Sequence, residues 1–219
     1  MSANTNLEPG RFPLAGHFST PAQQIDAGKM GMWGFLVTEV LLFGGLFVAY
    51  GIYRYLHPQA YIDAHGHLDV TMGTVNTVVL LVSSLTVALA IRAAQTDNPG
   101  QVTIHLIITL VCAATFMVVK YFEYSHKFHA GLLPGVYFTN ATVPNPDQAH
   151  IFFGIYFLMT GLHGVHVLIG MAVLFWLLIK NIKGHFCSEY YVPLEIGGLY
   201  WHLVDVIWIF LFPLLYLVG

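Results

Sequence analysis

Five long apolar stretches, separated by short polar segments, constrain the fold of this chain more than any other feature. A helix needs about 20 apolar residues to cross the hydrocarbon core of a bilayer. Such stretches occupy residues 30–56, 70–94, 103–124, 149–182 and 193–218. Proline, glycine, asparagine and aspartate cluster between them, where backbone groups can be hydrated. The pattern predicts an all-α integral membrane bundle of five transmembrane helices over residues 30–219, preceded by a polar segment at 1–29.

The distribution of positive charge predicts the orientation of these helices. Lysine and arginine concentrate in the cytoplasmic segments of membrane proteins. Segment 1–29 and the connections after the second and fourth stretches hold Arg11, Lys29, Arg92, Lys180 and Lys183. The opposite side holds Arg54, Lys120 and Lys127. We therefore expect a cytoplasmic N-terminal segment and a periplasmic C-terminus.

The overall composition excludes several classes of function. Only 9% of the residues are charged, whereas soluble domains average about 25%. The net charge is −3 and there is no basic block, which argues against nucleic acid as a partner. The two cysteines, Cys112 and Cys187, are far apart and form no CxxC motif. They indicate neither a disulfide framework nor a cysteine metal site.

Three ionisable residues deep in the apolar stretches are the first candidates for a functional site, because such residues are costly in a bilayer. Glu39, in "FLVTEVLLFGG", has no neighbouring cation, so it needs a partner on another helix or takes a lipid-, proton- or ligand-related role. His163 and His166, in "FLMTGLHGVHVLIG", share one helix face at i, i+3. Three roles fit this pair: interhelical hydrogen bonding, contact with a lipid headgroup or carboxylate, and metal or haem ligation.

The other polar residues within the stretches fit structural roles. Asn76 lies among small hydroxyl residues that favour interhelical hydrogen bonds. Lys120 and Glu123 form an i, i+3 pair near the outer interface, where a lysine can extend to the headgroups. His202 and Asp205 share a helix face, so the histidine is expected to satisfy the carboxylate locally, with a polar group of another helix as the alternative.

The motifs that are missing also limit the function. The histidines have no ExxH companion, and there are no paired cysteines for a binuclear copper site, so no metal site is predicted. A haem b site that pairs His163 or His166 with His202 is possible but has no signature. Equal halves and broken helices, which are typical of secondary transporters, are not found. These features favour a membrane subunit packed inside a larger complex.

Four segments resemble subunit III of the haem–copper cytochrome c oxidases. They are "GMWGFLVTEVLLFGGLFVAY", "VNTVVLLVSS", "FGIYFLMTGLHGVHVLIG" and "GLYWHLVDVIWIFLFPLLYLVG". The segment "VKYFEYSHKFHAGLLPG" is similar to the five-helix bacterial forms found with caa3-type oxidases. The mitochondrial form has two further N-terminal helices. The resemblance therefore implies a multi-pass protein of a bacterial inner (plasma) membrane.

The resemblance also implies a function. Family members are non-catalytic subunits without a redox centre in a proton-pumping oxidase of the aerobic respiratory chain. They stabilise subunit I, hold structural phospholipid and support proton uptake, while haem and copper lie in partner subunits. The expected partners are subunit I, subunit II and other small subunits, within a respiratory supercomplex. By resemblance, Glu39 faces the lipid cleft, His166 lies close to it, and His163 is its motif partner.

Two other interpretations remain open at the level of the sequence. The nearer one is the subunit III-like accessory protein of a nitric oxide reductase, which shares the five helices and the "WHxVDxxW" run. The remote one is a free-standing membrane transporter or a haem b anchor.

Overall fold

A computed structural model describes residues 15–16, 18–66, 68–134, 137–139 and 146–218; the first fourteen residues, including Arg11, lie outside this part. Within it, five helices are long and apolar enough to cross a membrane. They are α1 (Pro21–Leu56), α3 (Val70–Gln95), α4 (Pro99–His129), α5 (Pro146–Ile182) and α6 (Val192–Phe212). A short helix, α2 (Pro58–His65), follows α1, and a π-helical turn, η2 (Pro213–Leu217), follows α6. The prediction of an all-α bundle with five membrane helices is confirmed.

Side-chain caps set the starts of three membrane helices. The Thr20 hydroxyl accepts from the Gln23 backbone N–H, and Asp69 and Asn98 cap α3 and α4 in the same way. Such caps satisfy N–H groups that have no partner in the first helical turn. α1 therefore begins at Pro21 rather than at Met30. Its 36 residues span about 54 Å, so its ends extend beyond the hydrocarbon core.

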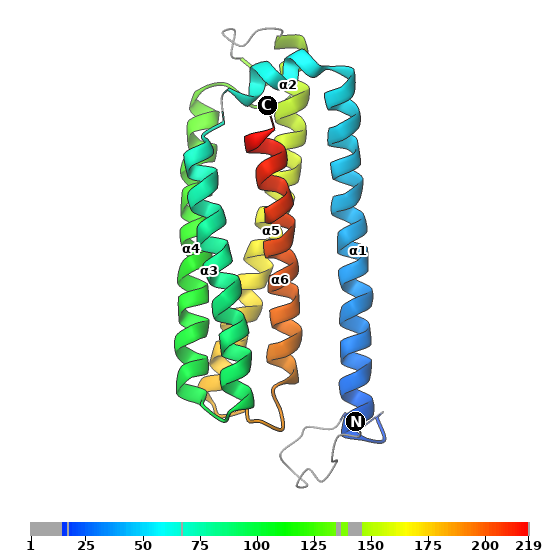
Figure 1. Ribbon diagram of the computed structural model, residues 1–219, viewed down its shortest axis with the longest axis vertical. Coiled ribbons are helices and arrows are strands. Elements are labelled where there is room, and N and C mark those ends of the chain that lie inside the picture. The colour runs from blue at the N-terminus through cyan, green and yellow to red at the C-terminus, as the bar shows by residue number, and fades with distance from the viewer. Residues whose placement is uncertain (1–14, 17, 67, 135–136, 140–145, 219) are drawn as a thin grey trace.

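The helices α3 to α6 form a closed bundle, and α1 lies to one side of it (Figure 1). In the bundle, α3 packs on α4 and α6, and α5 packs on α4 and α6. α1 packs along α5 and α6, and α2 lies across the end of the bundle near the C-terminus. The two marked chain ends lie at opposite ends of the molecule, as an odd number of membrane crossings requires (Figure 1).

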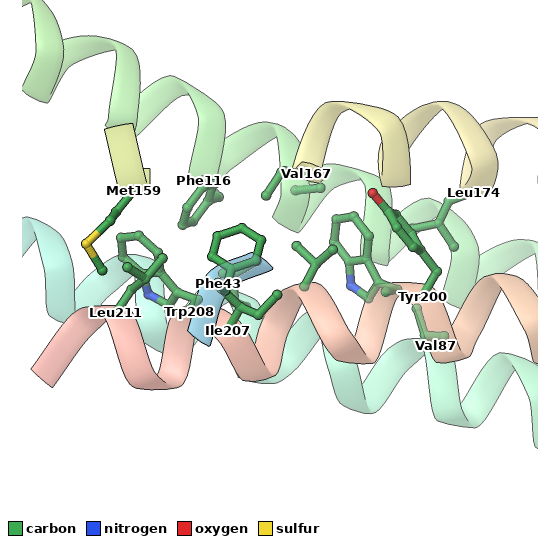
Figure 2. Close-up of a cluster of buried hydrophobic side chains, with 14 of the residues drawn as sticks. Phe43, Val87, Phe116, Met159, Val167, Leu174, Tyr200, Ile207, Trp208 and Leu211 are labelled. Carbon is green, nitrogen blue, oxygen red and sulfur yellow. The ribbon is translucent and has the colours of Figure 1, made fainter. Parts of the chain in front are cut away.

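The way α1 joins the bundle follows from its few buried side chains. The buried residues of α1 are Leu36, Phe43 and Tyr50, spaced seven residues apart. Seven residues make about two helical turns, so these side chains form one narrow seam. Phe43 reaches in among the core side chains of the bundle, near Ile207 (Figure 2). A narrow seam leaves room for cavities on both sides of α1.

The contact between α5 and α6 is tighter, and glycine makes it possible. A Cβ atom at Gly170 would lie 2.7 Å from Cε3 of Trp201. Without a side chain there, the indole packs directly on the backbone of α5. The Trp201 indole N–H in turn donates to Ser83 Oγ of α3 at 3.1 Å, and Trp208 donates to Thr77 Oγ1 at 3.0 Å. Both bonds fix α6 against α3, while the indole of Trp201 packs on α5.

Polar contacts hold α1 near both of its ends. Near the C-terminus, the Tyr50 hydroxyl donates to the Leu214 carbonyl oxygen at 2.7 Å, and Arg54 donates to the Val218 carbonyl. Pro213 has no backbone N–H to donate within the helix, and the π-helical turn η2 begins at that residue. At the other end, Lys29 forms a 3.0 Å salt bridge with Glu195 of α6.

Candidate functional site

Glu39 of α1 and His166 of α5 meet in the middle of the molecule. Oε2 of Glu39 lies 2.9 Å from Nε2 of His166, and only 14% and 10% of the two side chains are exposed. Glu39 and His166 are 127 residues apart in the sequence, so their contact joins two helices that are distant along the chain. The structure thus supplies the partner on another helix that Glu39 lacks locally.

The hydrogen bonds of His166 determine how many protons the pair holds. Nδ1 of His166 lies 2.8 Å from the Leu162 carbonyl oxygen, which can only accept, so Nδ1 carries a hydrogen. Nε2 then bonds to Glu39 in one of two forms: it accepts from a protonated carboxyl, or it donates as an imidazolium to a carboxylate. In both forms one proton is shared and the pair has no net charge. A neutral pair is far less costly inside a membrane than an isolated ion.

Two aromatic residues fix the position of His166. The Phe43 ring of α1 packs edge-on against the imidazole with the ring centres 5.3 Å apart. The Tyr200 hydroxyl of α6 donates to the His166 backbone carbonyl at 3.1 Å. His166 therefore contacts side chains of α1 and of α6.

A cavity of about 710 Å³ lies between α1 and the α5–α6 contact, and neither Glu39 nor His166 is among the described residues that line it. Its walls are mainly apolar and include Phe35, Trp176 and Tyr200, the residue that also bonds to His166. Lys180 Nζ lies 4.0 Å from the centre of the Trp176 ring, so an ammonium group sits next to one wall. We call this space the α1 cleft. It combines apolar walls with positive charge at the end where α5 finishes.

His163 takes a different place from the one expected. Its ring is fully buried between Phe116 and Trp208, with ring centres 5.6 and 5.3 Å away. Neither of its nitrogens makes a hydrogen bond to the described residues. The expected hydrogen bond beside Glu39 and His166 is therefore not observed. Within the described residues, no group of three or more His, Cys, Asp or Glu is arranged to hold a metal ion.

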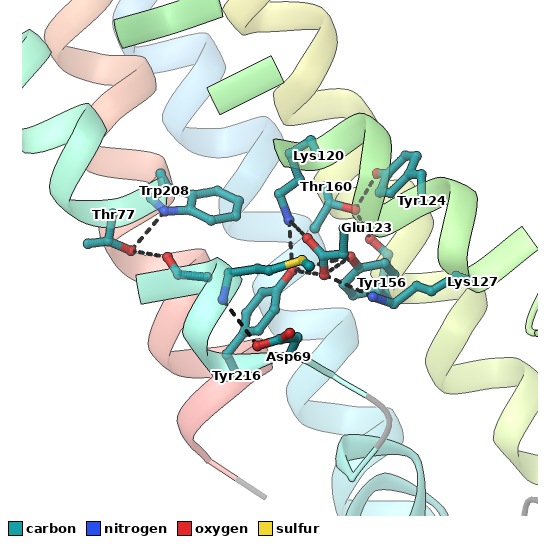
Figure 3. Close-up of polar contacts among 12 residues, drawn as sticks. Asp69, Thr77, Lys120, Glu123, Tyr124, Lys127, Tyr156, Thr160, Trp208 and Tyr216 are labelled. Atoms are coloured by element: carbon teal, nitrogen blue, oxygen red, sulfur yellow. Dashed lines mark hydrogen bonds and ion pairs between the residues drawn. The ribbon is translucent and has the colours of Figure 1, made fainter. Parts of the chain in front are cut away.

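Lys120 and Glu123 belong to a larger buried cluster (Figure 3). Oε2 of Glu123 accepts from Lys120 at 2.8 Å, and Oε1 accepts from Lys127 and from the Tyr156 hydroxyl, each at 2.8 Å. Tyr216 of η2 donates to the same Oε1 and accepts from Lys120 at 2.7 Å. We call these five residues the Glu123 cluster.

The i, i+3 ion pair expected between Lys120 and Glu123 is formed, but it lies inside the Glu123 cluster. Both side chains are buried, and the Lys120 ammonium lies 4.5 Å from the centre of the Trp208 ring, so it does not extend to the headgroups. Lys127 was detectable in the sequence, because it lies one turn beyond Glu123 on the same face of α4. Tyr156 and Tyr216 come from distant elements, and no local pattern indicates them.

The expected contact between His202 and Asp205 is not formed either. Nδ1 of His202 lies 2.8 Å from Ser84 Oγ on α3. Both carboxyl oxygens of Asp205 and both side-chain amide atoms of Asn76 are buried and make no hydrogen bond to the described residues. His202 therefore bonds to a hydroxyl of the neighbouring helix, and neither of the two expected partners of the Asp205 carboxylate is observed among the described residues.

Comparison with known proteins places the chain in a family. The family model described as "Cytochrome c oxidase subunit III" matches residues 14–219. The chain belongs to the cytochrome c oxidase subunit III family. Cytochrome c oxidase subunit 3 of Papio hamadryas is 32% identical over 93% of this chain and 74% of its own length. The protein of the same name from Thermostichus vulcanus is 30% identical over 88% of both chains.

A third relative has a different architecture. The protein named "Heme-copper oxidase subunit I+III" from Aeropyrum pernix is 30% identical over 92% of this chain, but the match covers only 24% of its own length. The chain thus spans about a quarter of that relative. Together with the five apolar helices, the family match identifies a haem–copper oxidase subunit III and a multi-pass protein of the bacterial plasma membrane.

Proposed function

We propose that this chain stabilises subunit I of the oxidase, holds a structural phospholipid in the α1 cleft, and supports proton uptake by the complex. The observation that carries the lipid role is an apolar cavity of about 710 Å³ whose wall residue Tyr200 bonds to His166, the partner of Glu39. In this proposal, haem and copper lie in partner subunits. The partners include subunit II and other small subunits, and the complex is part of a respiratory supercomplex.

The chemistry of the α1 cleft fits a phospholipid. Apolar side chains such as Phe35 and Trp176 match acyl chains, and the ammonium of Lys180 next to Trp176 attracts a headgroup phosphate. Glu39 adds a polar group deeper in the same region. Its Oε1 makes no hydrogen bond to the described residues and is not among the buried atoms, so it remains accessible.

The proposed contact with subunit I is supported by the Aeropyrum relative, whose name joins subunits I and III in one chain. A single chain keeps the two parts adjacent at all times. The role in proton uptake is supported by the family resemblance and by the proton that Glu39 and His166 share. Such a pair can change its proton position without creating a net charge in the membrane.

The test uses the purified oxidase complex with and without this chain. Optical spectra and the subunit composition identify the haems and the partners, and mass spectrometry identifies the phospholipids that co-purify. We expect subunit I and tightly held phospholipid with the chain present, and faster loss of oxidase activity during turnover without it. Partners that contain only haem b and non-haem iron would instead indicate a nitric oxide reductase complex. Equal activity lifetimes and equal lipid content would contradict the proposal.

A further inference from the structure

Asp205 is a buried acid for which the described part of the chain provides no counter-charge. Its side chain is 2% exposed, and no salt bridge among the described residues includes it. Asp205 lies thirteen residues beyond Val192, the first residue of α6, which places it near the middle of an apolar span of 26 residues. Glu123 is equally buried but faces the ammonium groups of Lys120 and Lys127. The two acids therefore have opposite surroundings.

Two tryptophans that anchor α6 to α3 determine where Asp205 points. The Trp201 indole donates to Ser83 Oγ at 3.1 Å. The Trp208 indole donates to Thr77 Oγ1 at 3.0 Å. Asp205 lies four residues after Trp201 and three before Trp208, so it shares their face of α6. The carboxyl group therefore faces α3, at a level between the two anchors.

Ser84 of α3 is the polar side chain that acts on the Asp205 carboxyl group. Both carboxyl oxygens lack a hydrogen bond to the described residues, so the two groups are close but not aligned. The torsion that turns a carboxyl group about its bond to Cβ is soft. The carboxyl group can therefore turn toward the Ser84 hydroxyl without a change in the backbone.

The Ser84 hydroxyl is available to pass on a proton. The nearby hydroxyls of Thr77 and Ser83 donate to backbone carbonyl oxygens of α3. The one hydrogen bond that Ser84 makes among the described residues instead joins its Oγ to Nδ1 of His202 at 2.8 Å. A hydroxyl donates one hydrogen bond and accepts two. Ser84 can therefore accept from a protonated Asp205 while it donates to Nδ1.

These contacts favour a neutral acid, because an isolated carboxylate is costly inside a membrane, whereas a carboxylic acid that donates to a hydroxyl is uncharged and satisfied. We propose that Asp205 is a proton-binding site, held as a carboxylic acid that is connected through Ser84 to His202. The site is separate from the Glu39–His166 pair, and it requires neither a lipid in the α1 cleft nor contact with subunit I.

The route for the proton follows from the same three side chains. When the proton of Asp205 passes to Ser84 Oγ, the hydroxyl hydrogen of Ser84 moves to Nδ1 of His202. A carboxylate and an imidazolium result, and the total charge stays unchanged. Nε2 of His202 makes no hydrogen bond to the described residues and is not among the buried atoms, so its hydrogen can exchange without opening the bundle.

Infrared difference spectroscopy of the purified complex that contains this chain tests the protonation state. The spectrum of Asp205→Asn is subtracted from that of the wild type, in ordinary and in heavy water. We expect the C=O band of a carboxylic acid, shifted to lower frequency in heavy water, and no carboxylate bands. Asparagine also donates and accepts hydrogen bonds without a charge, so the variant should assemble at wild-type yield. Carboxylate bands in the difference, or failure of Asp205→Asn to assemble, would overturn the proposal.

The rate of deuterium exchange tests the route through Ser84. The shift of the C=O band after transfer to heavy water is followed in the wild type, in Ser84→Ala and in Ser83→Ala. Ser83→Ala is the matched control, because it removes the neighbouring hydroxyl, which bonds to Trp201 instead. We expect at least threefold slower exchange in Ser84→Ala and the wild-type rate in Ser83→Ala. An unchanged rate in Ser84→Ala, or equal slowing in both variants, would reject the connection to His202 and with it the proposal.

Discussion

Two buried ionic groups in the described part of the chain, the Glu123 cluster and the Glu39–His166 pair, differ in how many hydrogen bonds their carboxyl oxygens make. In the Glu123 cluster, both carboxylate oxygens of Glu123 accept hydrogen bonds from side chains of the bundle. Two of these donors are the ammonium groups of Lys120 and Lys127. In the Glu39–His166 pair one carboxyl oxygen is bonded, and the other makes no hydrogen bond to the described residues. The comparison suggests that the closed group fixes the bundle, while the open group leaves capacity for a ligand.

Breaking the Glu123 cluster is expected to lower the stability of the protein more than any other change. Glu123→Ala removes the carboxylate and leaves the ammonium groups of Lys120 and Lys127 buried without their counter-charge. Breaking a buried ion pair in this way typically costs about 3–5 kcal/mol of stability. Denaturant unfolding of the chain in mixed micelles measures the change. A loss below about 1 kcal/mol would show that the Glu123 cluster does not hold the bundle together.

Overpacking the contact between α5 and α6 is expected to have an intermediate effect on stability. Gly170→Ala places a Cβ 2.7 Å from the Trp201 ring, and overpacking of this kind costs about 1–3 kcal/mol. Gly164→Ala is the matched control on the same helix, because its Cβ would meet nothing within 4 Å. Thermal unfolding of the two variants compares them. Equal stabilities would mean that α5 and α6 are not in tight contact at Gly170.

Weakening the attachment of α1 to the bundle is expected to have a smaller effect on stability. Tyr50→Phe removes the hydroxyl that bonds to the Leu214 carbonyl oxygen and to Arg54, a loss of about 0.5–1.5 kcal/mol. Hydrogen exchange should then quicken in η2 but stay unchanged at the start of α4, which lies at the opposite end of the bundle (Figure 1). Tyr53→Phe, a partly exposed neighbour on α1, serves as the control. Unchanged exchange in η2 would contradict the role of Tyr50.

The membrane helices were predictable because length and apolar composition alone determine whether a segment can cross a bilayer. Helix ends were less predictable, since the caps at Thr20 and Asn98 extend α1 and α4 into the polar flanks. The short helix α2 was not predicted, because its eight residues carry no membrane-length apolar pattern. It forms where Tyr61 packs against Phe152 of α5, which is a tertiary contact.

The contacts of the candidate site were predictable only for a residue that has no possible partner nearby in the sequence. Glu39 has no nearby cation in sequence, and this absence indicated an interhelical partner. The reverse held for Lys120 and Glu123, whose i, i+3 spacing suggested a self-sufficient pair and hid the contribution of Tyr156 and Tyr216. The side of a helix that faces a neighbour depends on the packing of the whole bundle, which local spacing does not encode.

The most direct test of the open group is the amount of phospholipid held by the oxidase complex of the Glu39→Gln variant. Gln keeps the shape of Glu39 but cannot share its proton with His166, and the stability should change by less than about 1 kcal/mol because the Glu123 cluster remains intact. Asp26→Asn, an exposed carboxylate on the same helix, is the control.

Phospholipid per complex is counted by native mass spectrometry, together with the number of turnovers before oxidase activity is lost. We expect Glu39→Gln to assemble normally, retain less phospholipid and lose activity after fewer turnovers, while Asp26→Asn behaves like the wild type. Unchanged lipid content and an unchanged catalytic lifetime in Glu39→Gln would contradict the claim that the Glu39–His166 pair supports a lipid site.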